Sequence, residues 1–113
     1  MRKINHKEDK IMKKIINGKM YNTETATEVF HYNNGLPYSD FNYLEESLYK
    51  KKTGEFFLAG KGGAMTKYAT RHADGTCSSG EDIFPLEIHI AKIWAEKYMT
   101  TEKYIKVFGE PEE

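Results

Sequence analysis

The sequence predicts a small α+β domain, with an antiparallel sheet of roughly three to five strands packed by helices from both halves of the chain. Two turn dipeptides, Asn17-Gly18 and Thr53-Gly54, lie between short apolar segments, which is typical of β-hairpins. Near the C-terminus, apolar residues recur at the spacing of an amphipathic helix. A chain of 113 residues supports one hydrophobic core, so we expect a single domain.

The first third is predicted to form a hairpin and then a helix. Asn and Gly both tolerate the positive φ that a type I′ turn requires, which predicts strands near 13–16 and 19–21. The helix is predicted to begin at Asn22 or Thr23 and to end before Gly35. Its apolar face is predicted from three residues at helical spacing, namely Ala26, Val29 and Phe30.

The middle of the chain is predicted to form a second hairpin. Residues 40–52 alternate in a way that fits either a strand with Leu44 and Leu48 inward or a short helix. We prefer a strand, because Thr53-Gly54 leads into a second apolar segment, EFFLAG. This segment is predicted to place Phe56 and Leu58 on one face and Phe57 and Ala59 on the other.

The glycine-rich segment Gly60–Gly63 has neither the P-loop nor the dinucleotide-binding spacing and is interpreted as a sharp turn or bulge. Residues 64–73 fit a helical turn or extended chain, and 74–80 are predicted as a loop. Pro85 indicates that 82–86 form an edge strand or a strand end.

Two helices are predicted at the C-terminal end. Residues 87–98 carry an apolar stripe of Ile90, Ile93, Trp94 and Tyr98, with Ala91 and Ala95 beside it. A second, shorter helix is predicted to start at Thr100 or Thr101, and three residues would face inward: Tyr104, Ile105 and Phe108.

Charge is balanced over the whole chain, with 17 basic and 17 acidic residues, but unevenly distributed. Residues 1–19 carry a net charge of +5, residues 20–80 of −1 and residues 81–113 of −4. We expect a flexible basic leader at 1–11, a domain at 12–109 and an acidic tail at 110–113. The zero total disfavours binding of nucleic acid by bulk charge and whole-molecule DNA mimicry.

The sequence predicts a cytoplasmic protein without a membrane partner. Its one cysteine, Cys77, cannot form an internal disulfide, which suits a reducing compartment. It has no apolar run near the ~18 residues of a membrane span and no secretion signal.

Residues that could support catalysis or metal binding are scattered, and we expect no catalytic residue, metal or cofactor. The four histidines do not have zinc-ligand spacing. A possible Cys–His nucleophile with an orienting acid is formed by His72, Asp74 and Cys77, which lie within six residues of one another. In such sites the partners usually come from separate parts of the sequence and meet in space, so we interpret these three as loop residues. A metal site would need acids from separate elements to converge, with Asp40, Glu46 and Asp74 as the candidates.

Several segments, taken in order, resemble a family of small proteins from phages and mobile elements of Gram-positive bacteria. They are KKIINGK, then Tyr21 and TETA, an acidic strand, a lysine-rich turn, an aromatic strand, and GKGG before KYA. The similarity spans about Met12 to Phe108. The chain departs from the family where Glu87 precedes the long helix, since family members often have Ser or Thr as N-cap there, and in its additional leader.

Some proteins that resemble this family are type II-A anti-CRISPRs, which inhibit Cas9. The resemblance implies a non-enzymatic inhibitor that binds Cas9, or its guide RNA complex, and blocks guide loading, DNA binding or cleavage. Two alternatives stay open. One is a nucleic-acid-binding protein or metal-dependent nuclease acting on guide RNA, and the other is a phage accessory protein with a different host target.

A partner surface is predicted where tyrosines and basic residues are interleaved in the middle of the chain. Tyrosine offers contact area at low entropy cost, and lysines beside rings suit either a protein or a single-stranded nucleic acid. The candidate partner-binding residues are Tyr38, Tyr43, Tyr49, Lys50, Lys51, Lys52, Lys61, Tyr68 and Arg71.

Overall fold

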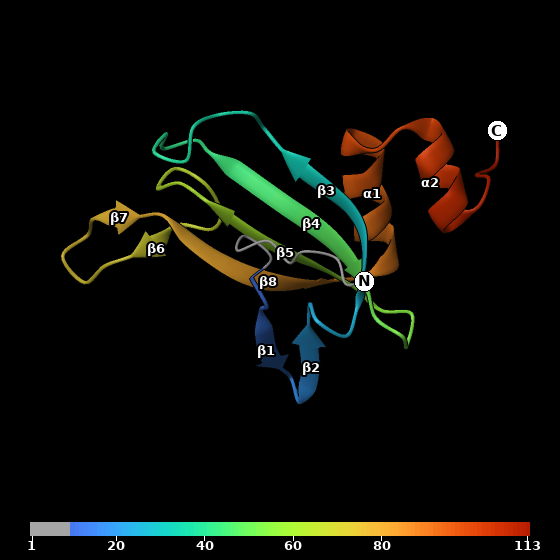
Figure 1. Ribbon diagram of the computed structural model, residues 1–113, viewed down its shortest axis with the longest axis horizontal. Coiled ribbons are helices and arrows are strands. Elements are labelled where there is room, and N and C mark those ends of the chain that lie inside the picture. Colours follow the sequence, from blue (N-terminus) through green and yellow to red (C-terminus); the bar gives the residue numbers. More distant parts are fainter. Residues whose placement is uncertain (1–9) are drawn as a thin grey trace, which may run out of the picture.

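The computed structural model describes residues 10–113 and confirms the α+β class (Figure 1). Its largest sheet has four antiparallel strands in the order β3-β4-β5-β8. These strands are β3 (Thr27–Asn33), β4 (Leu44–Lys50), β5 (Phe56–Gly62) and β8 (Gly80–Leu86). Of the predicted flexible leader, residues 1–9 lie outside the described residues.

The remaining elements lie on the two faces and at one end of this sheet (Figure 1). Helices α1 (Ile88–Tyr98) and α2 (Thr101–Phe108) cover one face, which we call the helix side. The hairpin of β1 (Lys13–Ile16) and β2 (Lys19–Asn22) packs on the other face, the hairpin side. A two-stranded hairpin of β6 (Thr70–Arg71) and β7 (Cys77–Ser78) extends beyond one end of the sheet.

Each face of the sheet has its own apolar core. On the helix side, the sheet residues Leu48, Phe56 and Leu58 form the core. They pack against Ala91, Trp94 and Ala95 of α1 and against Met99, which follows the helix. On the hairpin side, Tyr21 packs with Phe57, Ala59 and Ile83. This arrangement confirms the predicted facing of β5, whose successive side chains alternate between the two cores. Neither helix found in residues 10–113 is long and apolar enough to cross a membrane.

The first hairpin forms as predicted. Asn17 and Gly18 both have positive φ, 53° and 79°, and Ile16 pairs with Lys19 across the turn. The second hairpin is also confirmed, because β4 and β5 pair in continuous register from Leu44 opposite Gly62 to Lys50 opposite Phe56.

The predicted N-terminal helix is wrong, because its residues 27–33 form the edge strand β3. Phe30 lies opposite Leu48 of β4 and its ring contacts Trp94, with ring centroids 6.2 Å apart. The register shifts between Glu28 and Phe30, which marks a β-bulge at this point. The extra residue lets the neighbours Val29 and Phe30 both pack on the helix side, whereas Ala26 precedes β3 and packs on the hairpin side, so the helical spacing of the three is a coincidence.

The predicted turn or bulge at Gly60–Gly63 is wrong for its first three residues, since β5 continues to Gly62, and the chain leaves the strand only at Gly63. The predicted loop at 74–80 contains the short strand β7. The edge strand predicted at 82–86 is confirmed as part of β8, which lies at the border of the main sheet and holds Pro85.

Both C-terminal helices are confirmed, and Trp94 and Tyr98 of the predicted α1 stripe pack in the helix-side core, but the two isoleucines of that stripe do not. Ala91, Trp94 and Ala95 are buried, whereas Ile90 and Ile93 are 40% and 58% exposed. The small alanines let the helix approach the sheet closely, which turns the isoleucines outward. Glu87 precedes α1 without a side-chain cap bond, whereas Thr100 Oγ1 accepts a hydrogen bond from Lys103 N at 3.2 Å and caps α2. From α2, Tyr104, Val107 and Phe108 contact the helix-side core, so Val107 replaces the predicted Ile105.

Candidate functional site

The predicted partner-binding residues divide between the two ends of the main sheet and do not form one surface. Tyr38, Tyr43, Lys61 and Tyr68 lie on or beside the loops that follow β3 and β5, at what we call the loop end, and Arg71 lies beyond them on β6. Tyr49, Lys50, Lys51 and Lys52 lie where β4 leads into the β4–β5 turn, at the turn end. A seven-residue strand such as β4 separates these ends by about 20 Å.

Two of the predicted contact residues, Tyr43 and Tyr68, are buried, with exposed fractions of 6% and 3%. Tyr43 donates its hydroxyl proton to Glu45 Oε1. Tyr68 donates its hydroxyl proton to Glu46 Oε2 at 2.8 Å. Both rings therefore belong to the fold, and in this structure they offer no contact area to a partner.

Glu46 is the acceptor of a buried polar network on the helix side. Its side chain is 1% exposed and receives hydrogen bonds from Tyr68 and from Trp94 Nε1, the latter at 2.8 Å on Oε1. Lys67 Nζ lies 2.5 Å from Oε2 and supplies the opposite charge. A buried carboxylate needs such partners, because its desolvation is otherwise strongly unfavourable. The network joins β4, the loop after β5 and α1.

The glycines of the GKGG segment make room for this network. A Cβ on Gly60 would overlap the hydroxyl end of Tyr68, which crosses the sheet there to reach Glu46. A Cβ on Gly63 would lie 2.5 Å from the carbonyl oxygens of both Asp40 and Phe41. The glycines of GKGG and the tyrosine of KYA are therefore needed together, because the loop after β5 folds back over its own strand.

Burial raises the pKa of the Tyr68 hydroxyl, and the negative charge of Glu46 raises it further. Burial and the hydrogen bond to Glu45 likewise raise the pKa of Tyr43. A tyrosine in an unfolded chain ordinarily titrates near pH 10. Below about pH 10 both hydroxyls therefore contribute fully to the stability of the fold. As the pH rises above about 10 that stability is lost, because the unfolded chain releases the two protons and the folded chain retains them.

We therefore expect the free energy of unfolding to fall as the pH rises above about 10, with Tyr68 contributing a slope of up to about 1.4 kcal/mol per pH unit. The variant Tyr68→Phe is expected to be less stable at neutral pH but to lose stability less steeply in alkali. Urea unfolding at a series of alkaline pH values measures both slopes. Equal slopes for the two proteins would contradict this account.

Three large apolar side chains at the loop end are largely exposed to solvent. Tyr38, Phe41 and Met65 are 62%, 66% and 70% exposed, and we call them the loop-end cluster. Met65 N donates to the carbonyl oxygen of Phe41 at 2.9 Å, which places two loops far apart in sequence side by side. The ring of Tyr38 lies 5.3 Å from that of Tyr43, and Lys61 Nζ lies 5.8 Å from the Tyr38 ring centroid.

The loops that carry this cluster are held by their own hydrogen bonds. Asp40 N donates to Pro37 O at 2.9 Å, Tyr43 N to Asp40 O at 3.0 Å, and Gly63 N to Tyr43 O at 2.9 Å. Asn34 Nδ2 donates to Asn42 O at 2.9 Å. Because the backbone is fixed in this way, little conformational entropy would be lost when the exposed side chains bind a partner.

At the turn end, most of the predicted lysines already contact the fold. Lys50 Nζ lies 5.7 Å from the ring centroid of Phe56. Lys51 Nζ lies 4.2 Å from the ring centroid of Tyr21 and 3.0 Å from Glu55 Oε1. Lys52 makes no ion pair within residues 10–113. Tyr49 stacks on Phe57, with an interplanar angle of 9°.

A polar row crosses the hairpin side beside a cavity of about 660 Å³. Ser47 Oγ and His31 Nδ1 are 2.7 Å apart, and His31 Nε2 lies 2.9 Å from Glu45 Oε2. This order of groups resembles a nucleophilic triad. However, β4 lies between β3 and β5, so the backbone N–H groups around Ser47 point along the sheet and cannot stabilise an oxyanion above it. Sequence reasoning missed this row because its members come from two strands.

The residues considered for metal binding or nucleophilic catalysis do not converge. Among the described residues, no group of three or more His, Cys, Asp or Glu side chains could hold a metal ion. Asp74 Oδ1 accepts hydrogen bonds from Thr76 within the β6–β7 turn. His72 Nε2 lies 2.9 Å from Ser78 Oγ, and Cys77 pairs with Arg71 across the same hairpin.

Comparisons with protein-family models, with curated proteins and with solved structures find no match.

Proposed function

We propose that this protein inhibits a type II-A Cas9 effector by binding it, and thereby blocks guide loading, DNA binding or cleavage. The sequence resemblance supports the choice of partner. The loop-end cluster, three exposed apolar side chains on loops with a fixed backbone, supports a mechanism that acts through contact. An inhibitor of this kind needs an interface of about 1,600 Å² in total and no chemistry of its own.

The composition of the loop-end cluster supports a protein partner. Tyrosine, phenylalanine and methionine are enriched in protein interfaces, and a few such anchors carry most of the binding free energy. Exposed Phe41 and Met65 are unfavourable in water, so a partner that covers them gains the free energy of removing apolar surface from solvent. Their fixed positions reduce the entropy lost on binding.

The double variant Phe41→Ala/Met65→Ala is expected to raise the concentration needed to inhibit Cas9 cleavage of DNA by about tenfold or more. The matched control is Ile90→Ala/Ile93→Ala, which removes two exposed apolar side chains from α1 on the helix side. The control is expected to inhibit like the unmodified protein. Cleavage is followed with the inhibitor added before and after guide RNA, which separates guide loading from later steps.

Unimpaired cleavage at a saturating concentration of the unmodified protein, in both orders of addition, would remove the proposal. Equal inhibition by the loop-end variant and the α1 control would remove the loop-end cluster as the contact surface. Thermal unfolding of both variants establishes that they are folded.

A further inference from the structure

Two basic segments that are distant in sequence meet around one carboxylate at the turn end. Lys19, on β2, places its Nζ 2.7 Å from Glu55 Oε2. Lys51, in the β4–β5 turn, places its Nζ 3.0 Å from Glu55 Oε1. Glu55 thus holds two ammonium groups close together, and the pKa of its carboxyl is lowered to about 2 by hydrogen bonds from Lys19, Lys51 and Thr53.

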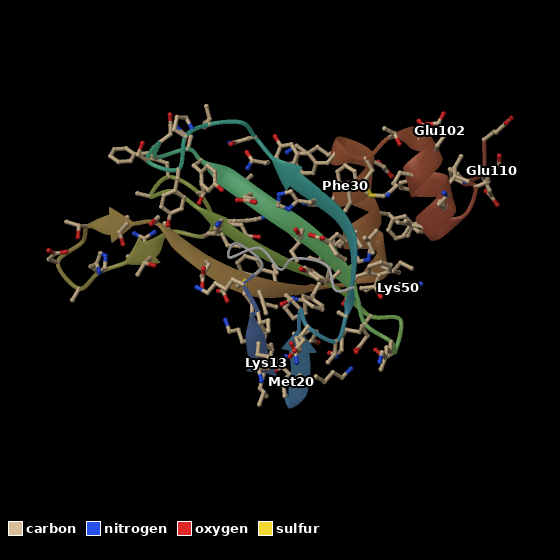
Figure 2. All side chains as sticks on the ribbon, in the orientation of Figure 1. Lys13, Met20, Phe30, Lys50, Glu102 and Glu110 are labelled. Atoms are coloured by element: carbon tan, nitrogen blue, oxygen red, sulfur yellow. The ribbon has the colours of Figure 1, made fainter. Side chains whose placement is uncertain are left out.

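The resulting surface carries an excess of positive charge. We define the lysine surface as Lys19, Lys50, Lys51 and Lys52. Lys19 and Lys51 contact Glu55 on the hairpin side, whereas Lys50 lies over Phe56 of the helix-side core, so this surface extends around the turn end of the sheet. Nearby Lys14 is balanced by Asp82, 2.5 Å away. Two further acids lie at this end of the sheet: Glu87 lines a shallow depression together with Glu55, and Glu28 lies opposite Tyr49 on β3. Figure 2 shows Lys50 at this end of the sheet, with Lys13 and Met20 on the projecting hairpin.

The composition of the lysine surface favours a polyanion over a protein. Lysine is depleted in protein–protein interfaces, because its ammonium group is strongly hydrated and its flexible chain loses entropy when fixed. The same group is a common ligand for phosphate. Here Glu55 and the Tyr21 ring already hold Lys19 and Lys51 in position, so part of that entropy is lost before any ligand binds. The chain has a net charge of zero, so binding here would depend on the placement of these four lysines rather than on bulk charge.

We propose that the lysine surface binds the phosphate backbone of a nucleic acid. Four lysines in contact with phosphates release condensed counterions, so the affinity falls steeply with salt. Contacts of this kind read backbone rather than bases, so binding is expected to be independent of sequence. The surface lies at the opposite end of the sheet from the loop-end cluster, and the two can be tested separately.

The test measures fluorescence anisotropy of labelled single-stranded RNA, duplex RNA and duplex DNA at several salt concentrations. The unmodified protein is expected to bind at least one probe with a dissociation constant of about 1–100 µM in low salt. The variant Lys50→Ala/Lys52→Ala, which breaks no ion pair of residues 10–113, is expected to reduce the slope of log affinity against log salt by about 2. The control Lys103→Ala/Lys106→Ala removes the same charge from α2 and is expected to leave the slope unchanged.

A second variant is expected to change the affinity for the nucleic-acid probes in the opposite direction. Glu55→Gln removes the carboxylate that pairs with Lys19 and Lys51 and is expected to tighten binding of the probes about two- to fivefold, a gain that damage to the fold cannot imitate. The three probes distinguish RNA from DNA as the source of phosphate. No binding of any probe at about 100 µM protein in low salt overturns the proposal. The proposal is also overturned if Lys50→Ala/Lys52→Ala and Lys103→Ala/Lys106→Ala change the salt slope equally. It is overturned as well if the protein binds poly-L-glutamate, or vesicles containing phosphatidylglycerol, as strongly as it binds the nucleic-acid probes.

Discussion

Replacing Glu46 by alanine is expected to lower the free energy of unfolding by about 3 kcal/mol. The change leaves the Tyr68 hydroxyl and the Trp94 indole N–H, both buried, without their acceptor. Each unsatisfied buried donor costs about 1–3 kcal/mol, and the lost side chain leaves space in the interior. A small domain has a total stability of about 5–15 kcal/mol, so this loss is large.

The control for this prediction is Glu96→Ala, which removes an exposed carboxylate from α1 and is expected to change stability by less than about 0.5 kcal/mol. Urea unfolding followed by circular dichroism measures both variants. If Glu46→Ala behaved like Glu96→Ala, the network around Glu46 would not stabilise the fold.

Replacing Gly60 by alanine is expected to lower the free energy of unfolding by about 2–3 kcal/mol. The added methyl group would overlap the Tyr68 hydroxyl and lie 2.8 Å from the carbonyl oxygen of Glu45, which is backbone and cannot move freely. Tyr68 would have to withdraw from Glu46, and its hydrogen bond would be lost with it.

The Tyr68→Ala background separates these causes. Without the ring, Gly60→Ala is expected to cost at least about 1 kcal/mol less than in the unmodified protein, because the clash with Tyr68 is absent. The free energies of unfolding of the four proteins in this cycle give the coupling directly. Additive effects would contradict the close approach of Tyr68 to Gly60.

The parts of the fold that could be predicted depend on local chemistry. Asn17-Gly18 determines its own turn, because few other residue pairs adopt two positive φ values without strain. The bulge between Glu28 and Phe30 depends on pairing with β4, so no local pattern could reveal β3. Periodicity located α1 and the burial of Trp94, but it also predicted that Ile90 and Ile93 face inward, whereas the smaller Ala91 and Ala95 occupy the space beneath the helix.

The candidate surfaces were harder to predict than the fold, because each depends on contacts between segments far apart in sequence. Phe41 and Met65 become neighbours only when Gly63 lets two loops approach. Lys19 and Lys51 meet only at Glu55. Composition drew attention to tyrosines and lysines, but it could not separate Tyr68, which is buried, from Tyr38, which is exposed.

The buried network and the loop-end cluster are linked in the structure. Lys67 and Tyr68 anchor to Glu46 the same loop that carries Met65, and Gly63 joins this loop to the one that carries Phe41. The core therefore positions the cluster, and variants of Glu46 or Gly60 are expected to weaken binding of a partner as well as stability.

The most direct test of the proposed function is calorimetric titration of the purified protein into Cas9, once without and once with guide RNA. A stable complex with at least one form is expected, with an affinity that falls about tenfold or more in Phe41→Ala/Met65→Ala and is unchanged in Ile90→Ala/Ile93→Ala. Absence of binding to both forms of Cas9 would contradict the central claim.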